Sequence, residues 1–283
     1  MNIFEALFLG VLQGATEFLP VSSSGHLVLA QHWLGTDQSS ASNLVFDVLV
    51  HAGTLMAICY HYRENLFRYF ALVTEEIWRT DPEINGATPL ARLWNDSNGR
   101  MLALVVIGSV PTVIIGLIWK DTFEAAFAKP RLVALFLMVT ATFLLLTLLG
   151  RERFKDVFAI PIWAALAVGI AQGIAITPGI SRSGATIACA LLFGVNRQNS
   201  ADLSFLMAIP AICGALLFSV KDLAGGYEAL AASVIIVGLL SSFVTGLIFL
   251  KLLLQFVRRG RFAWFAAYLF PVAVCAFYFF GSH

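Results

Sequence analysis

Long apolar stretches are the feature that most constrains how this chain can fold. Six of them could cross a bilayer, whose hydrocarbon core of about 30 Å requires roughly 20 helical residues; they are residues 44–62, 101–119, 131–149, 203–221, 230–251 and 262–280. Charged residues make up only 12% of the chain, well below the share typical of soluble domains. The sequence therefore predicts one all-α, polytopic integral membrane domain over residues 1–283, with about six transmembrane helices. The net charge of +1 gives no sign of nucleic-acid binding.

Two further apolar stretches, residues 3–35 and 159–194, are interrupted by proline, serine and glycine. As a helix, residues 3–18 would reach only about 24 Å, and Pro20 disfavours helix at Leu19. Broken backbone is tolerated at membrane depth only where it is buried in protein or lines an aqueous cavity. We therefore expect two re-entrant helical hairpins, each of which enters and leaves on one face of the membrane.

The two interrupted stretches match each other when the first is shifted by 159 positions. The shift aligns polar and small residues without a gap: Gln13 with Gln172, Ser22 with Ser181, Ser24 with Ser183, Gly10 with Gly169, Gly14 with Gly173, Gly25 with Gly184 and Gly35 with Gly194. Interrupted segments in corresponding halves of a membrane protein point to a binding site. Small residues alone could match by chance, but the polar pairs favour inverted internal repeats, approximately residues 1–119 and 159–280.

The distribution of basic residues predicts the orientation of the chain. With six spans and two hairpins that do not cross, thirteen of the 18 Lys and Arg residues fall on one face and four on the other, with Arg182 inside a hairpin. Cytoplasmic segments carry the excess of Lys and Arg. We therefore expect the polar segment 63–100 to be a cytoplasmic loop with some helix in it, and both termini and the mouth of the first hairpin to lie outside. The first ten residues lack the basic region of a signal peptide, so we expect them in the mature chain.

Polar side chains gather at the two breaks. Gln13 and Glu17 share a helix face at i, i+4 spacing, and the SSSGH segment at residues 22–26 offers hydroxyls and free backbone N–H groups that suit phosphate. Arg182 stands between two serines at the second break, and a charged residue at membrane depth is a functional candidate by default. Glu17 and His26 add acid–base or metal-ligand capacity.

Each feature taken alone also has a purely structural interpretation. A serine-rich turn can be a helix cap, Glu17 and Arg182 can form a structural ion pair, and His26 can be an interior hydrogen-bonding residue. Asp47 and His51 share a helix face and either support the site or satisfy each other. The combination at two related breaks favours a functional site.

These breaks also resemble the signatures of a known family. QGATEFLPVSSSGH, residues 13–26, resembles the first signature of the bacterial undecaprenyl-diphosphate phosphatases, the bacitracin-resistance family. PGISRSGAT, residues 178–186, resembles the second, and the similarity includes FDVLVHAGTL at residues 46–55. The resemblance implies hydrolysis of undecaprenyl diphosphate to undecaprenyl phosphate and inorganic phosphate in the bacterial inner membrane. That reaction recycles the lipid carrier for cell-wall polymers and confers bacitracin resistance. The resemblance also implies a divalent cation, Mg²⁺ or Ca²⁺.

By position, the resemblance implies a catalytic set and a diphosphate-binding set. The catalytic set is Glu17, Ser23, His26 and Arg182, and the binding set is Gln13, Ser22, Ser24, Ser181, Ser183 and Thr186. We expect Ser23 to be the nucleophile, with His26 as its general base and Glu17 orienting His26 or holding the metal. His26 as the nucleophile is the open alternative. The family allows Glu or Gln at position 13, and Gln here puts a metal site of two adjacent carboxylates in doubt.

Two other classes of function fit the same pattern. Inverted repeats with broken helices are typical of transporters, so a transporter or flippase of the polyprenyl phosphate lipid is the alternative, and a sensor of lipid diphosphates is a third. Phosphate release by the purified protein separates the enzyme from both. The sequence leaves open a homodimer and the preferred isoprenoid chain length.

Overall fold

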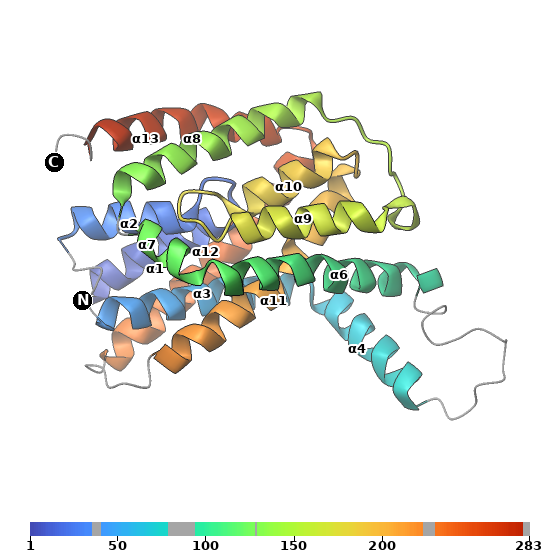
Figure 1. Ribbon diagram of the computed structural model, residues 1–283. Helices are drawn as coiled ribbons and strands as arrows, with labels where there is room; N and C mark the ends of the chain where they lie inside the picture. The colour runs from blue at the N-terminus through green and yellow to red at the C-terminus, as the bar shows by residue number, and fades with distance from the viewer. Residues whose placement is uncertain (36–40, 79–93, 128, 223–229, 280–283) are drawn as a thin grey trace.

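The computed structural model describes residues 1–35, 41–78, 94–127, 129–222 and 230–279. Within these ranges the chain is almost entirely helical, which confirms the all-α prediction (Figure 1). The helices are α1 (Ile3–Phe18), α2 (Ser23–Trp33), α3 (Ala41–His61), α4 (Arg63–Trp78), α6 (Ser97–Ile118), α7 (Lys120–Phe127), α8 (Pro130–Leu146), α9 (Ile162–Ile174), α10 (Arg182–Leu192), α11 (Arg197–Asp222), α12 (Ala232–Arg258) and α13 (Phe265–Phe279).

Among the described residues, five segments are helical, long and apolar enough to span a membrane, and they contain α6, α8, α11, α12 and α13. The sixth predicted span, residues 44–62, is α3, which bends by 74° where it passes into α4. The chain is therefore a multi-pass membrane protein. The segment 63–100, predicted as a polar loop, begins with α4, which extends away from the bundle in Figure 1. Residues 79–93 of that segment lie outside the described residues.

Each interrupted stretch folds as a pair of helices joined by a turn. Helix α1 ends at Phe18, two residues before Pro20, and α2 starts at Ser23 with Ser22 as its N-cap. Helix α9 ends at Ile174 and α10 starts at Arg182. In Figure 1 the α1–α2 hairpin opens toward the end of the molecule where both termini lie, whereas the α9–α10 hairpin opens toward the opposite end. The turns of both hairpins therefore reach into the middle of the bundle.

Close backbone contacts fix both hairpins in the bundle. A Cβ added at Gly10 of α1 would lie 2.7 Å from the carbonyl oxygen of Gly238 in α12. A Cβ added at Gly169 of α9 would lie 1.8 Å from the carbonyl oxygen of Gly108 in α6. Small residues allow helices in membranes to approach this closely. Each hairpin is thus held by a spanning helix that the repeat pattern assigns to the other half of the chain.

Candidate active site

The site lies where the turns of the two hairpins touch. The hydroxyl of Ser183 in α10 donates a hydrogen bond to the carbonyl oxygen of Leu19 in the first turn, 3.3 Å away. Thr140 of α8 supports the second turn, because its hydroxyl donates to the Gly179 carbonyl at 3.0 Å and accepts the Ser181 backbone N–H at 3.1 Å. Gly179 has φ +93°, and a Cβ there would lie 2.4 Å from the Val133 carbonyl oxygen. Only glycine fits this crossing of the turn over α8.

Glu17, at the end of α1, is the centre of the polar contacts. Its Oε1 accepts a hydrogen bond from Arg182 Nη2 at 2.5 Å. Its Oε2 accepts one from the Ser23 hydroxyl at 2.5 Å and one from Gln13 Nε2 at 3.0 Å. Only 6% of the Glu17 side chain and 17% of the Arg182 side chain are exposed. The structure therefore brings together Gln13, Glu17 and Ser23 of the first hairpin with Arg182 of the second.

Two buried polar atoms of this cluster lack a hydrogen-bond partner. Arg182 Nη1 and Gln13 Oε1 are buried and have no hydrogen-bond partner among the described residues. A buried guanidinium nitrogen without an acceptor is costly to leave unpaired. The planar guanidinium group suits phosphate oxygens. Arg182 thus holds Glu17 with one nitrogen and has a second nitrogen able to donate to an anion.

The first turns of α2 and α10 present matching serines to this region. Ser22 Oγ accepts the Gly25 backbone N–H at 3.4 Å and lies 3.3 Å from Ser24 Oγ. In α10, Ser181 Oγ accepts the Gly184 backbone N–H at 3.1 Å and lies 3.3 Å from Ser183 Oγ. Two helix N-termini, with their unpaired N–H groups and positive dipole ends, therefore meet at the cluster. This arrangement favours an anion such as phosphate.

Ser22 carries the only positive φ of a non-glycine residue within the described ranges, at φ 69°. Such backbone conformations cost about 1–3 kcal/mol and cluster at functional sites. The Ser22 carbonyl accepts hydrogen bonds from the His26 backbone N–H at 3.2 Å and from His26 Nδ1 at 2.9 Å. These two bonds hold the turn so that Ser23, the next residue, faces Glu17.

His26 is therefore placed differently from the sequence expectation. We expected His26 to act as the base of Ser23, but the Ser23 hydroxyl is directed at Glu17. Because the Ser22 carbonyl can only accept, Nδ1 of His26 carries the proton and Nε2 is free to accept. The Tyr268 hydroxyl of α13 lies 2.9 Å from Nε2, and the two rings stack with centroids 6.0 Å apart. Sequence reasoning missed Tyr268, whose only signal was a hydroxyl within an apolar span.

Comparison with known proteins identifies the family of the chain. The sequence matches the family described as bacitracin resistance protein BacA over residues 6–275. The chain belongs to this family. Similar proteins named undecaprenyl-diphosphatase include one from Desulforapulum autotrophicum, 40% identical over 97% of each chain. A second, from Desulfosudis oleivorans, is 43% identical over 95% of this chain and 96% of its own. A third, from Korarchaeum cryptofilum, is 40% identical over 97% of this chain and 98% of its own.

Three further residues of this BacA-family protein lie next to the cluster or contact its residues. Thr186 is fully buried, and its hydroxyl donates to the Arg182 carbonyl at 2.7 Å and lies 2.5 Å from Ser204 Oγ in α11. Thr186 therefore fixes the helix turn that carries Arg182 instead of facing the anion. His51 of α3 lies near Glu17, with Nε2 3.9 Å from Oε2. The Asp47 side chain accepts a hydrogen bond from Gln31 at 2.9 Å, and the Asp47 backbone carbonyl lies 2.7 Å from Nδ1 of His51, so His51 connects Asp47 with Glu17.

The donor set of this BacA-family site does not fit a resident divalent cation at Glu17. Within the described part of the chain, no group of three or more His, Cys, Asp and Glu residues could hold a metal ion. Both oxygens of Glu17 already accept hydrogen bonds, and the Arg182 guanidinium balances its charge. Gln13 Oε1 adds one neutral oxygen, whereas Ca²⁺ takes about six to eight oxygen ligands. The expected metal-ligand role of Glu17 therefore finds no support in these contacts.

Proposed function

We propose that this chain hydrolyses undecaprenyl diphosphate to undecaprenyl phosphate and inorganic phosphate, the activity that its relatives' names state. One contact carries the proposal: a serine hydroxyl at a helix N-terminus donates to a carboxylate at 2.5 Å, and an arginine holds the other carboxylate oxygen. A nucleophile, its base and an anion-binding cation are the parts that phosphoryl transfer requires. The membrane setting and the family explain why the substrate is a lipid.

In the first step, Ser23 Oγ attacks the terminal phosphorus while its proton passes to Glu17 Oε2. The bond between that phosphorus and the bridging oxygen breaks, and undecaprenyl phosphate leaves with the bridging oxygen. Arg182 Nη1 and the N-termini of α2 and α10 stabilise the negative charge on the non-bridging oxygens. Because these groups are fixed before the substrate binds, they need little reorganisation during the reaction.

In the second step, water attacks the phosphoserine. His26 accepts a proton from the water at Nε2, which carries no proton and from which the Tyr268 hydroxyl turns away as the water enters. The bond between Ser23 Oγ and phosphorus breaks, Glu17 returns its proton to Ser23, and inorganic phosphate leaves with the proton that His26 accepted. Glu17 is thus the partner of Ser23 in both steps, and His26 takes part in the second. This revises the roles expected from the sequence.

The test is phosphate release from undecaprenyl diphosphate by the purified protein in detergent micelles. We expect release by the unmodified protein and none above background by Ser23→Ala. Detergent micelles do not separate two aqueous compartments, so a transporter could not act in them. Neither a transporter nor a lipid sensor would release phosphate. Absence of release by the unmodified, folded protein would overturn the proposal.

We further propose that the protein lies in the bacterial inner membrane with its active site open to the outside. The support is the charge count, together with the shared position of both termini and the open end of the α1–α2 hairpin in Figure 1. A diphosphate headgroup is expensive to move through hydrocarbon. Hydrolysis on the outer side avoids that cost for a lipid released there.

Cysteine labelling in intact cells tests the orientation. On a background without the four native cysteines, Asp121→Cys before α8 should react with an impermeant thiol reagent. Glu152→Cys, in the connection between α8 and α9, should react only after lysis. Both positions are exposed, so accessibility is matched. The reverse pattern would place the site on the cytoplasmic side.

We also propose that the divalent cation implied by the family binds with the substrate. The Glu17–Arg182 pair is electrically neutral, so an empty site offers little attraction for a dication. A bound diphosphate supplies both negative charge and oxygen ligands. A dication that bound the purified protein tightly without lipid would contradict this proposal.

A further inference from the structure

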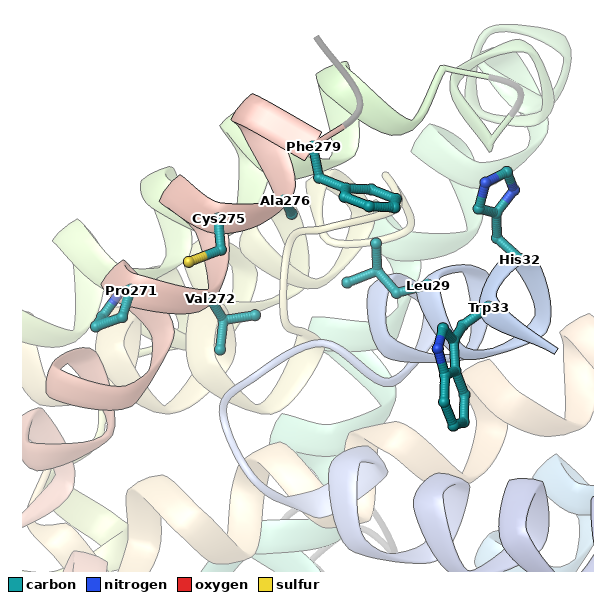
Figure 2. A pocket seen from close by; sticks show the side chains of 8 residues that line it. All are labelled: Leu29, His32, Trp33, Pro271, Val272, Cys275, Ala276 and Phe279. Carbon is teal, nitrogen blue, oxygen red and sulfur yellow. The ribbon is translucent and has the colours of Figure 1, made fainter. Parts of the chain in front are cut away.

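An apolar groove runs between α2 and α13, beside the site. Its volume is about 490 Å³, within the range of small-molecule sites. Figure 2 shows side chains from α2 on one side and from α13 on the other, including Leu29, Trp33, Val272, Cys275, Ala276 and Phe279. Trp33 is 79% exposed and Phe279 is 59% exposed. The groove is therefore open to the surroundings of the bundle, which for these helices is lipid.

The groove continues from the contact between His26 and Tyr268. On α2, Leu29 and Trp33 follow His26 at i+3 and i+7, so they share its face of the helix. On α13, Val272, Cys275 and Phe279 follow Tyr268 at i+4, i+7 and i+11, again on one face. The two helices meet through the His26–Tyr268 hydrogen bond of 2.9 Å. Beyond that bond, the same two faces line the groove for about 16 Å along α13.

We infer that this groove binds the part of the prenyl tail next to the diphosphate, an inference that rests on the proposed function. When the headgroup is held by Ser23 and Arg182, the attached tail must lie against an apolar surface, because hydrocarbon is unfavourable in a polar environment. The groove is apolar and has the volume of a ligand site. The His26–Tyr268 pair lies between the groove and the polar cluster. Tyr268 lies between the polar site and the groove, because its hydroxyl bonds His26 and the following turns of α13 line the groove.

A matched pair of variants on α13 tests the groove. Val272 lines it, and Val274, two residues away, is 41% exposed and does not. With Val272→Trp we expect the KM for undecaprenyl diphosphate to rise about tenfold or more, because the tail loses apolar contact. With dimethylallyl diphosphate, whose single isoprene unit is too short to extend along the groove, kcat/KM should stay unchanged. Val274→Trp should behave as the unmodified protein with both substrates.

Equal effects of the two variants, or an equal loss with both substrates, would overturn the inference. Melting temperatures of the two variants show whether Val272→Trp is folded. If Val272→Trp is not folded, the cysteine-protection measurement below tests the inference by itself.

The native Cys275 gives a readout that requires neither a groove variant nor turnover. In Ser23→Ala protein, undecaprenyl diphosphate should slow the reaction of Cys275 with a thiol reagent, and a phospholipid at the same concentration should not. Equal protection by both lipids would assign the groove to ordinary bilayer lipid. Protection without phosphate release by the unmodified protein would keep the groove and reject hydrolysis. Release without protection would do the opposite.

Discussion

The α1–α2 and α9–α10 hairpins begin their helices at equivalent positions, Ile3 and Ile162 for the first helix and Ser23 and Arg182 for the second. Each pair is 159 residues apart (162 − 3 and 182 − 23). Both second helices have 11 residues. Both are capped by a serine hydroxyl that accepts the N–H of a glycine three residues on. The backbone frame for binding an anion is therefore present twice.

The hairpins differ at the positions that carry charge or reactivity. Ile176 and Ala185 of the second hairpin stand where the first has Glu17 and His26, by the same shift of 159. Arg182 stands where the first has Ser23, so the proposed nucleophile and the cation occupy equivalent places in opposing turns. In the proposed mechanism, two similar backbone frames therefore have different roles. The first hairpin supplies the nucleophile and base, and the second supplies the positive charge.

Removing the proposed nucleophile should have the largest effect, and it best distinguishes the roles of the two hairpins. Ser23→Ala should lower kcat by about 10⁴-fold or more, because an essential nucleophile has no substitute. Ser24→Ala, one residue on in the same turn, removes a similar hydroxyl that does not bond Glu17 and should keep most of the activity. The measurement is phosphate release at saturating lipid. A largely active Ser23→Ala protein would shift the nucleophile to His26 or to water.

Removing the cation of the second hairpin should be nearly as severe. Arg182→Ala should lower kcat/KM by about 10³-fold, the scale of an arginine that stabilises a transferring phosphoryl group. It should also lower stability, since breaking a buried ion pair costs about 3–5 kcal/mol. Arg182→Lys keeps the charge for Glu17, so it should recover stability but little activity, because the planar fork is lost. Full activity with lysine would show that only the charge matters.

Loss of the Tyr268 hydroxyl should have a moderate effect. Tyr268→Phe removes one hydrogen bond to His26, worth about 1 kcal/mol, so kcat should fall about fivefold. The ring and the groove wall remain, so the KM should change little. Tyr60→Phe, on the exposed surface of α3, is the control. An unchanged rate and pH profile for Tyr268→Phe would remove Tyr268 from the positioning of His26.

The two equivalent glutamines give the finest comparison. Gln13→Glu should keep activity and lower the cation concentration for half-activity severalfold, because a second carboxylate beside Glu17 adds ligands for a dication. Gln172 instead donates to Thr112 Oγ1 at 3.2 Å and to the Met207 carbonyl at 3.3 Å. Gln172→Glu should lower the melting temperature and leave the cation requirement unchanged. If Gln13→Glu leaves that requirement unchanged too, the cation contacts the substrate alone.

Local sequence patterns were enough to predict the spanning helices, the hairpin helices and the two breaks. Apolar length predicted the spans, and Pro20 with the serine-rich segment predicted the end of α1 and the start of α2. The bend of 74° after α3 was not predicted. Tyr62, at that bend, donates a hydrogen bond to Asp202 of α11 at 2.9 Å, a contact between residues 140 positions apart. No pattern within a single helix contains such a contact.

The residues that could act are visible in the sequence alone: a carboxylate, serines, a histidine and an arginine at two related breaks in apolar helices. Periodicity and helix capping act over a few residues, so these features are visible in the chain. The fold then sets which of these groups meet. It paired Ser23 with Glu17 instead of His26, and it gave His26 to Tyr268, 242 positions away. It also turned Thr186 away from the site. These choices depend on packing between distant helices, which sets side-chain distances that no local pattern encodes.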